Sequence, residues 1–225
     1  MGASGIVELA SWRGAGSLGL RPHFHDETQL VLVLSGSRAF RVNGATVTVD
    51  AGHAALIPAG VLHAPMATSD AGTACLNAYI PASRSPSSVR IARIRQRWRS
   101  MDEISPEQIL EVADDILSGE ISQPVIASST GKLGAALSES GERIGDIAAN
   151  LGRSRESFTR MVTRELGIAP HAFRVLARLN LARQLLRQGS PIAVAAAEAG
   201  FSDQSHLTRL FRRTFGTTPG VYWRD

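Results

Sequence analysis

The stretch "HLTRLFRRTFGTTP" (His206–Pro219) repeats, in altered form, the earlier stretch "SFTRMVTRELGIAP" (Ser157–Pro170). Both contain Thr-Arg followed by apolar pairs and then Gly and Pro, and the second lies 49 residues after the first. Just upstream, "RIGDIAANLG" and "PIAVAAAEAG" correspond at an offset of 48 residues, so the length difference falls in a turn, where it is tolerated. A short apolar-striped segment before each longer one predicts a duplicated helix–turn–helix.

The longer helix of each repeat has an apolar face and a polar face. We expect the apolar faces to be buried; they consist of Phe158, Met161, Val162 and Leu166, and of Leu207, Leu210, Phe211 and Phe215. The polar faces carry Arg155, Glu156, Thr159, Arg160, Thr163 and Arg164, and Gln204, Ser205, Thr208, Arg209, Arg212 and Arg213. Such side chains suit the DNA major groove, where Arg pairs with guanine, Gln with adenine and Glu with cytosine. Two helices with merely solvated faces are the alternative, which the repetition disfavours.

The charge of the chain is unevenly distributed. Residues 131–225 contain 14 Lys or Arg against 8 Asp or Glu, whereas residues 1–130 contain 10 against 12. Lys132 is the only lysine, so nearly every positive charge is a guanidinium, which suits phosphate and guanine contacts. We therefore expect only the C-terminal part of the chain to bind a polyanion.

The segment between the repeats, "PHAFRVLARLNLARQLLRQGS" (Pro170–Ser190), is predicted to be one helix that begins at Pro170 and is closed by Gly189. A rigid helix there would fix the spacing of the two units. Successive major-groove entries on one face of DNA lie about 34 Å apart.

The C-terminal part resembles the AraC/XylS family of bacterial transcription regulators. The resemblance rests on "AGFSDQSHLTRLFRRTFGTTPGVYWR", close to the family signature, and on "PHAFRVLARLNLARQLL", similar to the family's linker helix. It implies double-stranded promoter DNA as a partner, and RNA polymerase as another if the protein activates. By position, it implies that the base-facing residues are Glu156, Thr159 and Arg160 in the first unit and Gln204, Ser205, Thr208 and Arg209 in the second.

The N-terminal part, from about residue 6 to residue 80, reads as short strands separated by Gly and Pro turns. Asn43-Gly44 lies between alternating segments, which is a strong hairpin signal. Many short strands of this kind indicate a small sandwich or barrel. "PASRSPSSVR" (Pro81–Arg90) then breaks the pattern. We predict an α+β multidomain chain, with a small β-barrel over 1–85, a helical linker over 86–128 and an all-α double helix–turn–helix domain over 129–225. Two motifs, in Arg21–Gly36 and Gly52–His63, make the barrel resemble the cupin barrel.

Two helices are expected in the linker. One covers "IARIRQRWRS" (91–100), and the other lies in "SPEQILEVADDILSG", with Ser105 as N-cap and Gly119 at its end. The apolar stripe of the second helix, formed by Ile109, Val112, Ile116 and Leu117, could pack on the same chain or on a partner subunit in a homodimer.

"RPHFHDETQLVLVLSG" (Arg21–Gly36) places two histidines, His23 and His25, on the same side of an extended segment. The segment resembles the first motif of the cupin barrel, except that Gln29 stands where the motif has glutamate. "GHAALIPAGVLH" resembles the second motif, and this implies that His63 joins His23 and His25. Three imidazoles can bind Zn, Ni, Co, Cu or Fe(II), with water or Gln29 completing the shell.

Other interpretations of the histidines stay open. They could line a pocket for an organic effector, or bind nothing. A cupin metalloenzyme, such as a dioxygenase or isomerase with an accessory DNA-binding module, is the competing class; we expect no enzyme, because a fused DNA-binding domain argues for sensing. No apolar run approaches the roughly 20 residues of a membrane span, and the single cysteine, Cys75, suits a reducing compartment. We therefore expect a cytoplasmic protein without membrane contact.

Overall fold

The computed structural model describes residues 8–14, 21–42, 45–66, 72–95, 104–119, 122–127, 133–134, 137 and 141–222. The chain divides into two compact units. The first contains residues 1–18 and 24–129, and the second contains residues 130–225 together with the short segment 19–23. The described helices include none that is both long and apolar enough to cross a membrane.

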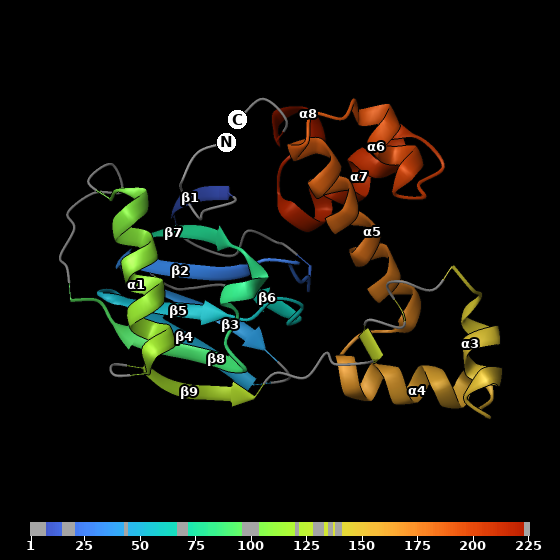
Figure 1. Cartoon of the computed structure of the whole chain (residues 1–225), viewed down its shortest axis with the longest axis horizontal. Coiled ribbons are helices and arrows are strands. Elements are labelled where there is room, and N and C mark those ends of the chain that lie inside the picture. The colour runs from blue at the N-terminus through green and yellow to red at the C-terminus, as the bar shows by residue number, and fades with distance from the viewer. Residues whose placement is uncertain are drawn as a thin grey trace. The chain divides into compact units, whose positions relative to one another are not determined.

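The first unit is built from two antiparallel sheets (Figure 1). The larger has the strand order β1-β7-β2-β5-β8-β9 and the smaller has the order β4-β3-β6. The strands are β1 (Glu8–Gly14), β2 (Thr28–Ser35), β3 (Ser37–Val42), β4 (Ala45–Asp50), β5 (His53–Ile57), β6 (His63–Pro65), β7 (Thr73–Ile80), β8 (Ser88–Arg93) and β9 (Ser122–Ala127). A single 3-10 turn, η1 (Ala82–Arg84), separates β7 from β8. Strands β3 and β4 pair as the predicted hairpin, with Val42 opposite Ala45, while the turn Asn43-Gly44 lies outside the described residues.

Strand β2, inside the larger sheet, is buried on both faces, which is why it reads as a continuous apolar run. Leu30 and Leu32 point to the face covered by helix α1 (Pro106–Ser118). Val31 and Val33 point to the opposite face, where they pack against residues of the smaller sheet such as Phe40. A β-rich N-terminal domain followed by an all-α domain is thus confirmed, with its strands arranged in two sheets.

Helix α1 forms as predicted. Ser105 accepts the Gln108 backbone N–H at 3.3 Å, and Gly119 closes the helix at φ 80°. Its buried residues Ile109, Val112, Ala113 and Ile116 pack on the larger sheet of the same chain (Figure 1). The stripe is therefore covered within the chain rather than offered to a partner subunit.

The prediction for the segment before α1 is wrong. Residues 91–93 belong to strand β8 and not to a helix, and residues 96–100 lie outside the described residues. In the sequence, Ile91, Ile94 and Trp98 have the spacing of an apolar helix stripe. In the structure, Ile91 packs in the core on one face of the sheet and Ile94 packs in the core on the other. Because apolar residues face both ways, the segment lacks the alternation of apolar and polar residues that indicates a strand. Strand β9, absent from the prediction, pairs with β8. Strands β8 and β9 and helix α1 thus supply two sheet strands and a covering helix to the first unit instead of a helical linker.

The second unit contains two helix pairs joined by a long helix, as the repeat predicts (Figure 1). The helices are α3 (Ile144–Asn150), α4 (Arg155–Leu166), α5 (Pro170–Arg187), α6 (Ile192–Glu198), α7 (Gln204–Phe215) and α8 (Pro219–Tyr222). Phe158, Val162 and Leu166 of α4 are buried, as are Leu207 and Phe211 of α7. Met161, Leu210 and Phe215, also expected in the core, are only half-buried.

Candidate functional site

Helices α4 and α7 start from equivalent caps. Ser154 accepts the Ser157 N–H at 3.2 Å before α4, and Asp203 accepts the His206 N–H at 2.7 Å before α7. Both helices end at a glycine in the left-handed region, Gly167 (φ 77°) and Gly216 (φ 80°). The caps fix where each helix begins and therefore which side chains occupy its first turn.

The polar faces of α4 and α7 reach solvent as predicted. Nine of the eleven predicted DNA contacts are exposed, and the two threonines, Thr159 and Thr208, are half-buried. The exposed ones are Arg155, Glu156, Arg160, Arg164, Gln204, Ser205, Arg209, Arg212 and Arg213. Each helix–turn–helix repeat therefore presents one exposed polar helix face that starts at a capped N-terminus.

Two carboxylates at the starts of these helices are held ionised. Hydrogen bonding to its own backbone N–H, and then to Ser154, lowers the pKa of Glu156. The His206 backbone N–H, and then the Ser202 hydroxyl, lowers the pKa of Asp203. At neutral pH, Glu156 can thus accept a hydrogen bond from a base, whereas Asp203 is occupied as a cap.

Helix α5 supports both helix pairs through a buried side that includes Phe173, Leu176 and Leu179. Near its end Arg183 lies over the rings of Phe215 and Tyr222, at 5.0 and 5.8 Å from their centroids. This packing holds the last turn of α7 against α5, as a rigid linker between the two helix–turn–helix repeats requires.

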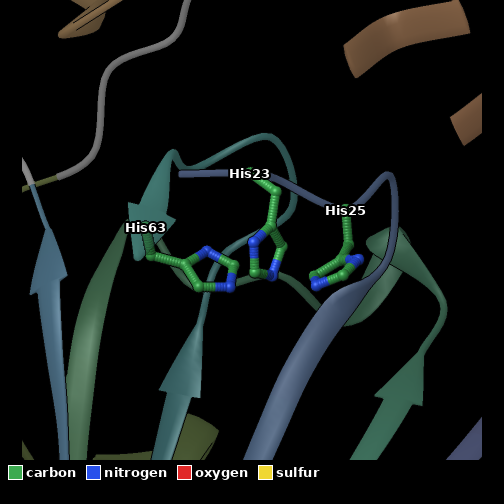
Figure 2. A group of neighbouring side chains, drawn as sticks. All are labelled: His23, His25 and His63. Carbon is green, nitrogen blue, oxygen red and sulfur yellow. The ribbon is translucent and has the colours of Figure 1, made fainter. Parts of the chain in front are cut away.

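A second candidate site is formed by three histidines (Figure 2). His23 and His25 lie on the segment before β2, and His63 begins β6. Ring nitrogens of the three lie within 4.8 Å of one another, and all three residues are buried. Figure 2 shows the three imidazole rings gathered at one place, and the structure thus brings together the histidines singled out by the two cupin-like motifs.

The hydrogen bonds of two of these rings fix their tautomers. His23 Nδ1 lies 2.7 Å from the Arg21 carbonyl, and His63 Nδ1 lies 2.9 Å from the Val61 carbonyl. A carbonyl oxygen only accepts, so each Nδ1 carries the proton, and each neutral ring has its lone pair on Nε2. Burial lowers the pKa of His63 to about 4, partly countered by its hydrogen bond to Val61, and the ring is neutral at pH 7. Neutral, oriented imidazoles are what a metal ligand set needs.

Gln29 stands at the position where the cupin motif has glutamate. It is buried in β2 and donates Nε2 to Asn77 Oδ1 at 2.9 Å. Its other amide atom, Oε1, has no hydrogen-bond partner among the described residues. Across the sheet Gln29 is opposite Tyr79, whose ring lies 4.7 Å from that of His25. The amide therefore keeps an acceptor oxygen on the side of the sheet where the histidines gather.

One buried residue of this interior was missed by sequence reasoning. Arg38 is 4% exposed and lies on the same face of β3 as Phe40 and Val42. The signal was present in "SRAFRV", where Arg38 occupies an inward position of an alternating strand. A charge at such a position is rare enough to mark a candidate functional residue.

A β-rich domain followed by an all-α domain with two exposed, capped helix faces is the architecture expected of a DNA-binding regulator with a ligand-binding domain. Comparisons with known proteins agree. The AraC-like ligand binding domain matches residues 5–120, and a helix-turn-helix domain matches residues 147–225. The chain belongs to the AraC family of transcriptional regulators.

Individual relatives resemble different parts of the chain. The probable transcriptional regulator LumQ of Photobacterium leiognathi is 24% identical over 226 aligned residues, covering 89% of this chain and 90% of LumQ. The transcriptional activator NphR of a Rhodococcus species is 40% identical over 83 residues, covering 36% of this chain but only 24% of NphR. A crystal structure of ToxT from Vibrio cholerae, with bound unsaturated fatty acid, has the same fold, with a TM-score of 0.59, 12% identity and coverage of 96% of this chain and 93% of ToxT.

Proposed function

We propose that this protein is a cytoplasmic one-component regulator, in which a ligand of the N-terminal domain controls the binding of promoter DNA by α4 and α7. The observation that carries the proposal is the pair of capped helices with matching exposed polar faces, in one chain with a buried histidine cluster. Helix faces of this composition suit the major groove. The N-terminal domain, fused to them in one chain, can supply the ligand signal that controls their binding to DNA.

In the proposed DNA complex the exposed side chains have two roles. Glu156, Thr159 and Arg160 in α4, and Gln204, Ser205, Thr208 and Arg209 in α7, contact base edges and give specificity. The remaining arginines contact phosphates and give most of the salt-dependent affinity; they are Arg155, Arg164, Arg212 and Arg213.

The ligand proposed for the histidine cluster is a divalent transition metal. His23, His25 and His63 fit such an ion, because their rings are buried, close together and, for two of them, oriented by a hydrogen bond from Nδ1 to a backbone carbonyl. Zn, Ni, Co or Fe suits three imidazoles, with water or Gln29 Oε1 completing the shell. The alternative is an organic effector held by the same rings. A neighbour of the same fold is named as binding an unsaturated fatty acid, which makes an organic ligand the second candidate.

Metal analysis of purified protein tests the ligand, and DNA binding tests the function. Untagged wild-type protein should carry about one transition-metal ion per chain, and the double variant His23→Ala/His25→Ala should carry almost none. Equal, near-zero metal in both, with no uptake on titration, would contradict the metal proposal. If the metal-loaded protein turned over a substrate without any change in DNA affinity, the competing cupin enzyme would be favoured over the regulator.

A further inference from the structure

The interior of the N-terminal domain contains a buried positive charge, that of Arg38. Strand β3 pairs with β4 on one side and β6 on the other, and its residues Arg38, Phe40 and Val42 all point inward, 4%, 3% and 0% exposed. Arg41, on the opposite face of the same strand, is exposed. The strand's own alternation therefore directs the Arg38 guanidinium into the space between the two sheets.

Aromatic rings hold the Arg38 guanidinium without neutralising it. Its central carbon lies 4.8 Å from the centroid of Trp12 and 5.5 Å from that of Phe40. Among the described residues, no carboxylate lies within ion-pair distance of Arg38, and its Nη1 has no hydrogen-bond partner. Burial lowers the pKa of Arg38, an effect partly opposed by Cys75 and Tyr79. Even so, a guanidinium stays protonated at neutral pH, so Arg38 is a buried cation that none of the described residues pairs with an anion.

The polar groups near Arg38 also lie on the inner side of the larger sheet. Tyr79 contacts the ring of His25 and is paired across the sheet with Gln29. Gln29 Oε1, like Arg38 Nη1, is a buried polar atom that has no hydrogen-bond partner among the described residues. The Phe40 ring, which lies 5.5 Å from the Arg38 guanidinium carbon, is 6.2 Å from the His63 ring, so Arg38 and the histidine cluster share one interior.

We propose that Arg38 anchors a small organic carboxylate as an effector of this regulator. An unpaired buried charge is unfavourable, and a carboxylate that accepts two parallel N–H bonds from the guanidinium compensates it. One guanidinium balances the single charge of a carboxylate but leaves half the charge of a phosphate dianion uncompensated, so the site favours the carboxylate. The rings of Trp12, Phe40 and Tyr79 suit the apolar body of such a molecule. The inference rests on the proposed function, since it assigns to the same sensing domain an organic ligand at Arg38, beside the metal proposed at the histidines.

Calorimetric titration of the full chain tests the anchor. The probes are benzoate and hexanoate, each compared with its neutral amide, together with inorganic phosphate. The acids should bind wild-type protein roughly 10-fold or more tightly than the amides, and Arg38→Met should weaken acid binding by roughly 10- to 100-fold. The control Arg41→Met, on the exposed face of the same strand, should leave all affinities unchanged. Equal binding of acid and amide, tighter binding of phosphate, absence of binding, or full retention in Arg38→Met would each overturn the proposal.

Urea unfolding separates an anchor from a merely structural arginine. Without ligand, Arg38→Met should unfold at the same or a higher urea concentration than wild type, because it removes a buried charge that no described carboxylate balances. A clearly lower midpoint would assign Arg38 to packing against Trp12 and Phe40 and overturn the anchor. DNA titrations with and without benzoate separate this inference from the proposed function. Carboxylate binding without any change in DNA affinity contradicts the effector role of the carboxylate and leaves the metal-controlled regulator standing. Metal-controlled DNA binding without carboxylate binding overturns the anchor alone.

Discussion

Replacing Arg209 with alanine should weaken DNA binding without harming the fold. Arg209 is exposed on α7 and makes no hydrogen bond or ion pair with the described residues, so its removal leaves no buried group unpaired. A bidentate contact to guanine contributes about 1–3 kcal/mol of discrimination, which corresponds to a roughly 5- to 150-fold loss of affinity at the cognate site. The same change should relax the preference at one base pair.

Fluorescence anisotropy supplies the assay, with a DNA site selected from random sequence by the wild-type protein. Titrations at several salt concentrations distinguish a base contact from a phosphate contact. Arg209→Ala should lose affinity for the selected site and little for unrelated DNA, whereas Arg213→Ala should weaken both and reduce the slope of log K against log salt by about 0.9. Arg41→Ala, an exposed arginine of the N-terminal domain, is the matched control. Unchanged affinity and unchanged base preference in Arg209→Ala would refute the assignment of α7 as a base-contacting helix.

Three further predictions concern stability and ligand binding. Phe211→Ala empties a fully buried position of α7 and should cost about 3–5 kcal/mol; denaturant unfolding followed by circular dichroism measures this, and a loss below about 1 kcal/mol would contradict the core placement. Because the pKa of His63 is lowered to about 4 from 6.5, the unfolded chain takes up a proton on this ring at a higher pH than the native chain does. The contribution of His63 to the free energy of unfolding is therefore fully present above pH 6.5, and up to about 3 kcal/mol of it is lost as the pH drops towards 4. The urea midpoints of chelator-treated wild type and of His63→Gln should diverge over this pH range. Parallel curves would contradict the lowered pKa of His63. Zn²⁺ should raise the unfolding temperature of wild type but not that of the His23→Ala/His25→Ala variant, and equal shifts would point to binding elsewhere.

The C-terminal architecture could be predicted because its signals are local. The 49-residue repeat, the caps Ser154 and Asp203, and the glycines at the helix ends all lie within one or two turns of the structure that they specify. Exposure of the polar helix faces then follows from the position of buried residues such as Phe158 and Phe211.

The N-terminal domain was harder to predict because its structure depends on long-range pairing. Strand β8 is buried on both faces and therefore lacks alternation, and β9 joins the sheet only through β8. The convergence of His63 with His25 joins segments 38 residues apart, and only the resemblance to cupin motifs implied it. Arg38 was missed because charged residues in strands usually face solvent, although its alternation with Phe40 marked it as inward.

The central claim is that a ligand of the N-terminal domain controls DNA binding, and one titration tests it most directly. Anisotropy measures the affinity of chelator-treated wild-type protein for its selected DNA site, with and without saturating Zn²⁺, beside the His23→Ala/His25→Ala variant. A ligand that couples to DNA binding typically changes affinity by roughly 5- to 150-fold. We predict a change of this size, in either direction, in the wild type and none in the double variant. Metal binding by the wild type with identical DNA affinity in both states would contradict the claim.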